Sequence, residues 1–312
     1  MRIVFLGTAD FAVPCLQALR EAGYDLAGVV TQPDRPKGRG KRLAPPPVKE
    51  TAQALGLAVL QPEKIKDPEA IEQIKELNPE CLVVVAYGQL LPKSLLEMTP
   101  YGCINVHASL LPRYRGAAPI HRAIMDGCQE TGVTTMFVTE KLDAGDIILQ
   151  SKRVIEPDMT VGELHDLLAG DGAKLLLDTL ALMAEGKAVR KPQEEAEATY
   201  AAMLRREDEL IDWQRTAQEI VNQIRGMDPW PGAYTCWQGK NLKIWKATVR
   251  PGNWEAMPGT VVNTDDHGLL IVGGDGQGVL VRELQLQGKK RLAVKEFLKG
   301  NSLVPGTILG CD

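Results

Sequence analysis

The sequence predicts an α/β protein with an open, mostly parallel sheet and flanking helices, followed by a smaller C-terminal β-barrel. Three observations carry this prediction. The first 31 residues alternate an apolar run, a helical pattern and a second apolar run, as a βαβ unit does. Residues 81–86 are almost entirely apolar, which is typical of a central parallel strand. Several short β-rich runs separated by turn residues follow residue 230.

The first half alternates strand and helix patterns. The expected strands are Arg2–Leu6, Leu26–Thr31, Cys81–Ala86, 103–109, Thr131–Val138 and Ile147–Arg153. The expected helices are Phe11–Arg20, Val48–Leu55, Pro68–Leu77, Pro92–Met98, Pro119–Asp126 and Val161–Leu182. The first turn, Gly7-Thr8-Ala9-Asp10, lacks the Gly-x-Gly-x-x-Gly fingerprint, and no acidic residue ends the second strand. We therefore expect a Rossmann-like sheet that binds no NAD.

The second half carries an amphipathic helix and short strands. The helix is expected at Thr216–Met227, and the strands near Tyr234–Trp237, Leu242–Ala247, Gly259–Val262, Leu269–Val272 and Val279–Leu286. Residues from Gly186 to about Arg205 have no apolar periodicity. The sequence thus predicts one domain over 1–186, a linker over 187–205 and a second domain over 206–312.

Composition bounds the class of protein. The 312 residues suffice for two hydrophobic cores, and a formal net charge of −4 disfavours a protein that coats nucleic acid nonspecifically. No apolar run is long enough for a signal peptide or a membrane span. The six scattered cysteines form no metal-ligand pattern. We expect reduced core thiols, no metal, no membrane contact and a cytoplasmic location.

Three polar residues alternate at the end of the expected strand 103–109. Asn105, His107 and Ser109 alternate with apolar residues, so in a strand they share one face. A Pro- and Gly-rich loop follows, which marks the carboxyl end of the strand, where open α/β sheets bind ligands. Taken alone, an Asn-x-His pattern favours the other interpretation, in which Asn105 and His107 are polar residues that cap a strand through backbone hydrogen bonds.

Asp143 favours a catalytic interpretation. It lies in the turn Lys141-Leu-Asp-Ala-Gly-Asp146, between two apolar runs. Asn105 can donate to an oxyanion, protonated His107 can also donate, and Asp143 can orient the imidazole and accept a proton. These three residue types suit acyl transfer without a Ser or Cys nucleophile. His121 and His165 lie within expected helices, and we assign them no catalytic role.

A basic segment follows the second strand. Residues 32–47 are rich in Pro and Gly, so a long, mobile loop is expected there. Its five cationic residues are Arg35, Lys37, Arg39, Lys41 and Arg42. A solvated surface is the ordinary reading of such a run, but the loop leaves the carboxyl end of a strand, beside the expected site. An anionic substrate is therefore plausible.

Several motifs in order resemble one family. They are Phe5-Leu-Gly-Thr-Ala-Asp-Phe-Ala12, Thr31-Gln-Pro-Asp-Arg-Pro36, Gly38-Arg-Gly40, Ala86-Tyr-Gly88, Asn105-Val-His-Ala-Ser-Leu-Leu-Pro-Arg-Tyr-Arg-Gly-Ala-Ala-Pro119, Asp143-Ala-Gly-Asp146, Ile211-Asp-Trp213 and Asp228-Pro-Trp-Pro231. Over its whole length the chain resembles the bacterial methionyl-tRNA formyltransferases. Its N-terminal half is similar to the wider 10-formyltetrahydrofolate-dependent transferases.

The resemblance implies an activity and its residues. Formyl would pass from 10-formyltetrahydrofolate to the α-amino group of initiator methionyl-tRNA, in a monomer whose residues 1–186 are catalytic. The catalytic residues would be Asn105, His107 and Asp143. The folate site would include Ser109, Leu110, Leu111, Pro112, Tyr87, Gly88 and Gln89. The resemblance further implies that the segment Arg35–Arg42 reaches the acceptor end of the tRNA and that an OB-like domain over 206–312 helps to hold it.

Two other functions are compatible with parts of the pattern. The same folate chemistry could serve a nucleotide-linked sugar or a glycinamide, although the C-terminal domain and the basic segment disfavour this. A noncatalytic RNA-binding protein with an OB-like barrel is the other alternative. The combination of Asn105, His107 and Asp143 speaks against it.

Overall fold

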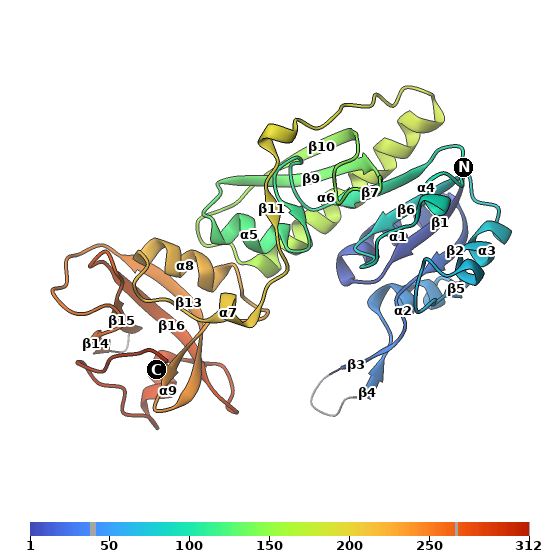
Figure 1. Ribbon diagram of the computed structural model, residues 1–312. Helices are drawn as coiled ribbons and strands as arrows, with labels where there is room; N and C mark the ends of the chain where they lie inside the picture. The colour runs from blue at the N-terminus through green and yellow to red at the C-terminus, as the bar shows by residue number, and fades with distance from the viewer. Residues whose placement is uncertain (38–41, 266–267, 312) are drawn as a thin grey trace. The chain divides into compact units, whose positions relative to one another are not determined.

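The computed structural model describes residues 1–37, 42–265 and 268–311. The chain divides into two compact units (Figure 1). Unit 1 comprises Met1–Pro119, Glu130–Val154 and His165–Ala201, and unit 2 comprises Ile120–Gln129, Ile155–Leu164 and Ala202–Asp312. Within the described residues, no helix is long and apolar enough to cross a membrane.

Unit 1 contains the predicted mostly parallel sheet. Its strands are β1 (Arg2–Gly7), β2 (Asp25–Val30), β5 (Val59–Leu60), β6 (Cys81–Val85), β7 (Cys103–His107), β9 (Glu130–Phe137) and β10 (Ile147–Val154). They lie in the order β10-β9-β7-β6-β1-β2-β5. The five strands from β7 to β5 are parallel, whereas β9 pairs antiparallel with both β7 and β10. The Rossmann-like sheet expected from the sequence is therefore confirmed.

The strand order reverses at β1. From β1 the chain proceeds to β2 and β5 on one side, and then returns to β6 and β7 on the other. Such a reversal opens a crevice beyond the carboxyl ends of the strands, where α/β proteins bind their ligands. The turns after β1 and β6 lie at this edge. Gly7, which ends β1, has no room for a side chain, because a Cβ atom would approach the Phe5 ring to 2.6 Å.

Helices connect and cover the strands of this sheet (Figure 1). They are the 3-10 turn η1 (Asp10–Ala12), α1 (Val13–Glu21), α2 (Pro47–Ala54), α3 (Pro68–Glu76), α4 (Lys93–Leu96) and α6 (Val161–Ala184). Helix α5 (Pro119–Met125) belongs to unit 2 except for its first residue. Proline at the first position begins α2 and α3, where its missing N–H costs nothing. The long helix predicted at 161–182 is confirmed.

Helix α6 covers one face of β7 and leaves the other for polar groups. A Cβ atom at Gly172 would lie 3.0 Å from Val106 Cγ1, so the helix approaches this strand closely. Beside it, the hydroxyls of Thr135 on β9 and Thr179 on α6 hydrogen-bond at 2.7 Å. Neighbouring residues of a strand point to opposite sides. Asn105 and His107 therefore lie on the face of β7 that α6 does not cover.

The basic segment contains regular structure, so the expectation of an irregular loop over 32–47 is wrong. Strands β3 (Arg35–Lys37) and β4 (Arg42–Ala44) pair antiparallel, with Pro36 opposite Leu43. Proline is tolerated here because a two-stranded ribbon has only edge strands. Arg39 and Lys41 lie outside the described residues.

Residues of the expected linker pair with strands of unit 1. Lys191 exchanges backbone hydrogen bonds with Ile147, a 3-10 turn η2 spans Glu195–Glu197, and β11 (Tyr200–Ala201) pairs in parallel with β8 (Arg115–Gly116). Residues 187–201 thus belong to unit 1. The domain boundaries given from the sequence stay a prediction.

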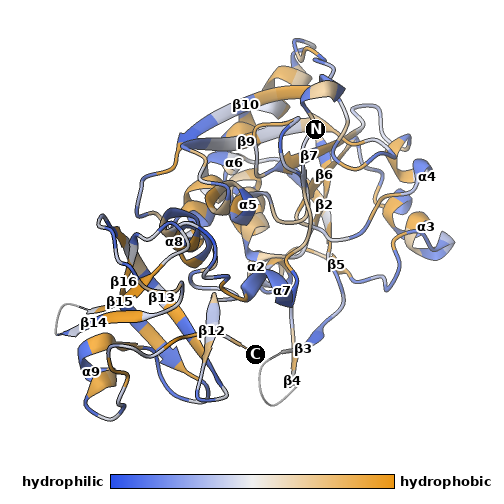
Figure 2. Cartoon of the chain, turned by 60° about the vertical axis from the view of Figure 1, so that its left-hand side comes forward, coloured by the Kyte–Doolittle hydropathy of each residue, from blue (hydrophilic) through white to orange (hydrophobic). Residues whose placement is uncertain are grey.

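Unit 2 contains the smaller antiparallel sheet. Its elements are α7 (Arg206–Glu209), α8 (Ala217–Arg225), β12 (Tyr234–Trp237), β13 (Lys240–Arg250), β14 (Val261–Asp265), β15 (Gly268–Val272), β16 (Gly278–Leu286), β17 (Leu292–Ala293) and α9 (Val294–Leu298). The sheet order is β12-β13-β16-β15-β14, and β17 pairs with β16. Figure 2 shows apolar residues along β14 and β15 and an almost wholly hydrophilic α7. Closure of this sheet into an OB-like barrel stays a prediction.

The cysteines are only partly as expected. Cys15, Cys81 and Cys103 are buried free thiols, and Cys128 is free and half-buried. Cys236 and Cys311, in contrast, form a disulfide that joins β12 to the end of the chain. The prediction of six reduced thiols is therefore wrong for this pair. The two residues are 75 positions apart, so their proximity could not be read from spacing.

Candidate active site

Strand β7 places Asn105 and His107 side by side on one face. Asn105 pairs with Met136 of β9 and His107 with Thr134, while Ile104 and Val106 are buried. The Asn105 side chain is half-exposed, and no described residue engages its amide in a hydrogen bond. His107 is 6% exposed. Asn105 and His107 are two positions apart in β7, so they lie on the same face, as predicted.

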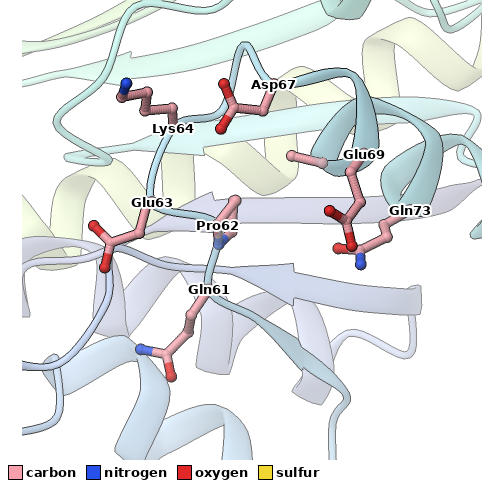
Figure 3. A pocket seen from close by; sticks show the side chains of 8 residues that line it. Gln61, Pro62, Glu63, Lys64, Asp67, Glu69 and Gln73 are labelled. Atoms are coloured by element: carbon pink, nitrogen blue, oxygen red, sulfur yellow. The ribbon is translucent and has the colours of Figure 1, made fainter.

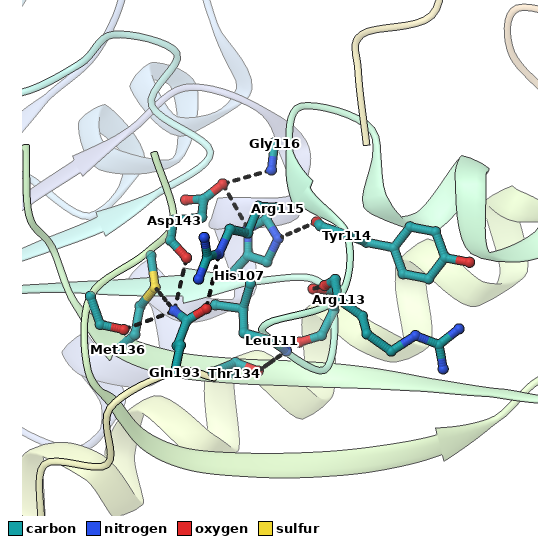
Figure 4. A network of polar contacts seen from close by, with 12 residues as sticks. His107, Leu111, Arg113, Tyr114, Arg115, Gly116, Thr134, Met136, Asp143 and Gln193 are labelled. Carbon is teal, nitrogen blue, oxygen red and sulfur yellow. Dashed lines mark hydrogen bonds and ion pairs between the residues drawn. The ribbon is translucent and has the colours of Figure 1, made fainter. Parts of the chain in front are cut away.

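Both ring nitrogens of His107 face oxygen atoms (Figure 4). Nε2 lies 2.9 Å from the Tyr114 carbonyl oxygen, and Nδ1 lies 3.7 Å from Asp143 Oδ2. Only the first distance is a hydrogen bond. A carbonyl oxygen can only accept, so Nε2 carries the proton, and Nδ1 is the nitrogen that gains one when the ring is charged. The structure thus brings together the imidazole and the carboxylate that the sequence selected.

Asp143 is fixed from two directions. Its backbone is left-handed, with φ at 48°, a conformation uncommon for a residue other than glycine. Its Oδ2 accepts a hydrogen bond from the Gly116 N–H at 2.8 Å, and its carbonyl accepts one from Gln193 Nε2 at 2.8 Å. These contacts aim the carboxylate at the imidazole.

The loop after β7 is held by internal hydrogen bonds. The strand ends at His107, so Ser109 lies beyond it and not on its face, contrary to expectation. The Ser109 hydroxyl donates to the Arg113 carbonyl at 2.6 Å. Thr134 Oγ1 donates to the Ser109 carbonyl and accepts from Leu111 N–H. Leu110 and Pro112 are half-buried, and Leu111 packs with Met136 and Ile147.

Residues 87–89 are held mainly by other parts of unit 1. The Tyr87 ring is buried in a core cluster with Val4, Leu82 and Leu95, and burial raises the pKa of its hydroxyl to about 12. Gly88 has φ at 91°. Gln89 accepts from Ile65 N–H at 2.8 Å and donates to the Glu63 carbonyl at 3.0 Å. The side chains of Tyr87 and Gln89 are thus not joined to His107 by these contacts.

The cationic residues of the hairpin are described only in part. Arg35 is exposed and forms an ion pair with Glu63 at 3.1 Å. Lys37 and Arg42 are opposite each other in the β3–β4 pair. Arg39 and Lys41 are outside the described residues, so their role stays a prediction.

Three residues at the site were not selected from the sequence. Arg115 is 1% exposed, donates from Nε to Gln193 Oε1 at 3.1 Å and forms an ion pair with Glu195 at 3.0 Å. Gln193 and Glu195 lie in the segment expected to be a linker, whose composition carried no signal of a site. Arg115 lies inside the motif 105–119, and this position is the sequence feature that could have marked it as a residue of the site.

A separate pocket lies between the end of β5 and α3 (Figure 3). It has a volume of about 280 Å³ and shares no lining residue with the His107 cluster. Its carboxylates, Glu63, Asp67 and Glu69, would repel an anionic ligand. Among the described residues, no group of three or more His, Cys, Asp or Glu side chains is arranged to hold a metal ion.

Comparisons with known proteins agree with this fold. Residues 1–180 match the family described as formyl transferase, and residues 203–302 match the formyl transferase C-terminal domain. These matches define the class as the formyl transferases. The methionyl-tRNA formyltransferases of Desulforamulus reducens and Moorella thermoacetica are 55% and 54% identical to this chain. The first alignment covers 100% of this chain and 98% of the relative, and the second covers 100% of both. The chain belongs to the methionyl-tRNA formyltransferase family.

A solved structure shows the same fold at low sequence identity. WlaRD, a sugar 3N-formyl transferase crystallised with dTDP and 5-N-formyl-THF, superposes with a TM-score of 0.67 at 18% identity. The superposition covers 93% of this chain and 99% of that protein. At this identity the likeness concerns the fold alone.

Proposed function

We propose that the protein transfers the formyl group of 10-formyltetrahydrofolate to the α-amino group of methionyl-tRNA, and that its acceptor is the initiator tRNA. The observation that carries the proposal is the pairing of His107 with Asp143 on the strand that also presents Asn105, in a chain alike over its full length to methionyl-tRNA formyltransferases. The formyl donor is a cosubstrate, and the proposed reaction needs neither a metal nor NAD.

The reaction begins with attack of the neutral amine on the formyl carbon. A tetrahedral intermediate forms in which the formyl oxygen carries negative charge. The C–N10 bond of the folate then breaks, N10 takes a proton and the amine loses one, so that formyl-methionyl-tRNA and tetrahydrofolate result. The oxyanion is the group that the site must stabilise, because its charge develops only along the reaction.

Asn105 and His107 supply the donors for this oxyanion. The Asn105 amide is half-exposed and engaged by no described residue, so its N–H groups are available to a substrate. In the charged imidazole, Nε2–H is held by Tyr114, whereas Nδ1–H lies 3.7 Å from Asp143 and is only weakly engaged. Nδ1–H is therefore the ring donor that we assign to the oxyanion, and the charge of Asp143 stabilises the imidazolium.

Asp143 has a second task in this scheme. Its Oδ2 accepts from Gly116 N–H and faces the imidazole. The carboxylate stabilises the imidazolium by its charge, and Oδ1 accepts the proton of the attacking amine through a water molecule. We assign these catalytic roles to Asn105, His107 and Asp143.

Folate binding is assigned to the loop 109–112 and to residues 87–89. Both segments follow parallel strands, β7 and β6, which are neighbours in the sheet. The hydrogen bonds that Thr134 makes to Ser109 and Leu111 keep the loop in one shape before the ligand arrives. The buried Tyr87 ring, the hydrogen bond that Thr8 Oγ1 donates to the Tyr87 carbonyl at 2.8 Å and the Gln89 amide hold this segment in one shape.

Recognition of the tRNA is assigned to Arg35, Lys37, Arg39, Lys41 and Arg42 and to the C-terminal domain. The segment 35–42 holds five cations within eight residues in a chain of net charge −4, which is the pattern of a local phosphate contact. We propose a catalytic domain over 1–186, a linker over 187–205 and a tRNA-binding domain with an OB-like barrel over 206–312. We also propose that the protein is a cytoplasmic monomer.

A second acceptor class is favoured by one specific observation. The structural neighbour WlaRD is a sugar 3N-formyl transferase, so this fold serves amino sugars as well. In contrast, the sequence match to methionyl-tRNA formyltransferases extends across both halves of this chain. The tRNA acceptor is therefore the better supported of the two.

The experiment is incubation of the protein with 10-formyltetrahydrofolate and one acceptor at a time. Initiator methionyl-tRNA, elongator methionyl-tRNA, a dTDP-amino sugar and glycinamide ribonucleotide are supplied in parallel, and formylated product is measured. We expect product with initiator methionyl-tRNA and far less with the others. Product only with the sugar or glycinamide would overturn the acceptor, and no product with any acceptor would overturn formyl transfer.

A further inference from the structure

We propose that Gln193, held by Arg115, is a positioning residue that keeps Asp143 in its working place. The inference rests on the proposed catalytic role of Asp143. Gln193 was expected in a linker and touches neither His107 nor Asn105 through the hydrogen bonds that the structure gives it. Its contacts are instead directed at the turn that carries Asp143 (Figure 4).

The turn needs an external support. Asp143 has φ at 48°, and the next turn residues approach β9 closely, since a Cβ atom at Gly145 would lie 1.8 Å from the Phe137 carbonyl oxygen. A single side-chain amide spans this turn. Gln193 Nε2 donates to the Asp143 and Gly145 carbonyls, both at 2.8 Å, using one hydrogen for each.

The orientation of the Gln193 amide is set by Arg115. The Arg115 Nε–H donates to Gln193 Oε1 at 3.1 Å, so the oxygen must face the guanidinium and the NH₂ group must face the turn. The reversed amide would set donors against donors on one side and acceptors against acceptors on the other. Arg115 is itself buried and paired with Glu195 at 3.0 Å.

Strand β8 therefore supports both the side chain and the backbone of Asp143. Gly116 binds the carboxylate directly through its N–H at 2.8 Å, and Arg115 holds the backbone through Gln193. Gly116 has φ at 119°, and a Cβ atom there would lie 2.8 Å from the Ala201 carbonyl, so the strand pair fixes this amide. Without the Gln193 donors, Asp143 would keep only its carboxylate contact, and its distance to His107 would no longer be determined.

The test compares Gln193→Leu and Gln193→Glu with wild type. Leucine removes both donors at similar volume, whereas glutamate keeps the acceptor for Arg115 and replaces the donors by an oxygen. We expect turnover to fall about 10-fold to 100-fold in both variants, as a displacement near 1 Å can cause. KM for the folate and for methionyl-tRNA should stay within about twofold, because neither substrate is bound by Gln193. Lys191→Ala is the matched control, since its contacts to Ile147 are made by the backbone.

A double-mutant cycle separates positioning from a general structural effect. In an Asp143→Ala background, measured in single turnovers, Gln193→Leu should cause no further loss, because the group it positions is gone. An equal loss with and without Asp143, or wild-type turnover in the glutamate variant, would overturn the inference.

An exposed partner keeps the test valid if the Gln193 variants fold poorly. Glu195 is 74% exposed and pairs with Arg115, so Glu195→Ala leaves Gln193 and the turn in place. It should lower the melting temperature, because the buried guanidinium loses its counter-charge, and lower turnover modestly with unchanged KM. Unchanged turnover in Glu195→Ala together with unfolded Gln193 variants would also count against the inference. Absence of formyl transfer by the wild type would instead refute the proposed function.

Discussion

At the scale of single residues, the site combines a buried imidazole with a half-exposed amide. His107 is 6% exposed and bonded to Tyr114, whereas the Asn105 amide is engaged by no described residue. Removing a donor without a protein partner leaves no buried polar group unsatisfied. The two residues should therefore differ in what their removal does to stability, although both serve the same oxyanion.

We expect Asn105→Ala to lower turnover about 100-fold to 1,000-fold, as loss of one oxyanion donor typically does. The free energy of unfolding should change by less than about 0.5 kcal/mol, as for an exposed substitution. Turnover in saturating substrates and urea unfolding measure the two quantities. Near-normal turnover in the folded variant would remove Asn105 from the mechanism.

Asp143→Asn separates the charge of the carboxylate from its shape. The asparagine oxygen can still accept from Gly116 N–H, and the backbone contact to Gln193 is unchanged. The negative charge behind the imidazolium is lost, so we expect turnover to fall at least about 10-fold with little change in folate affinity. Turnover is measured from pH 5 to 9, and a rate like that of wild type at every pH would show that the charge is not used.

At the scale of elements, two contacts between segments lead to predictions: the pairing of β3 with β4 and the contact between α6 and η1. Strands β3 and β4 pair antiparallel within the basic segment, and His165 ties α6 to the turn after β1. His165 is largely buried, lies 3.4 Å from Asp10 and packs edge-on against Phe11 at 5.5 Å. These contacts are structural, and His165 was assigned no catalytic role from the sequence.

The hairpin gives a prediction that depends on salt. Arg39→Ala with Lys41→Ala should slow formylation of methionyl-tRNA and make its decline with salt shallower, by up to about two in logarithmic slope. Folate affinity should not change. The charge-matched control is Arg20→Ala with Lys75→Ala, two exposed cations on α1 and α3. If the hairpin variant formylates tRNA as fast as wild type in every salt concentration, the cations are only solvated.

The contact between α6 and η1 gives a prediction that depends on pH. Burial alone lowers the pKa of His165, but its hydrogen bonds to Asp10 and Asp166 outweigh this, so the pKa is raised above 6.5. The hydrogen bond to His165 lowers the pKa of Asp10 below 3.8. The histidine contribution is thus complete below pH 6.5 and is lost as pH rises through the raised pKa, whereas the Asp10 contribution is lost as pH falls through the lowered one.

His165→Gln should therefore cost more stability at pH 5 than at pH 9. Because Asp10 is 67% exposed, the difference should not exceed about 1 kcal/mol. Urea unfolding of wild type and variant at both pH values measures it, with Asp178→Asn, an exposed residue of α6, as control. A cost independent of pH would mean that only packing against Phe11 is lost.

At the scale of the whole molecule, the six cysteines are divided between two states. Four are free, and burial raises the pKa of Cys15 and Cys81 to about 12, which keeps these thiols unreactive in the folded protein. Cys236 and Cys311 form a disulfide. Disulfides are rare in cytosolic proteins, because the cytosol keeps thiols reduced. The proposed cytoplasmic location therefore favours two reduced thiols at Cys236 and Cys311, whereas the structure has a disulfide there.

Titration of thiols in denaturant measures whether Cys236 and Cys311 are oxidised or reduced in the isolated protein. Without reductant we expect four reactive thiols in the unfolded chain, and six after reduction. Cys236→Ser should raise the first number to five, because it releases Cys311. Six thiols without reductant would show that the pair is a dithiol in the isolated protein.

The sequence by itself determined the parallel sheet, the long helix over 161–184 and the choice of Asn105, His107 and Asp143. These follow from local patterns, because apolar periodicity reports burial, and because Asn105 and His107 at the end of a strand gain a catalytic interpretation once Asp143 is added. Only the tertiary structure decided that Gln193 contacts the turn of Asp143, that Cys236 meets Cys311 and that Arg35–Lys37 pairs with Arg42–Ala44. Each of these joins residues through space, with partners that leave no periodicity in the chain: Gln193 is 50 positions from Asp143, and Cys311 is 75 from Cys236.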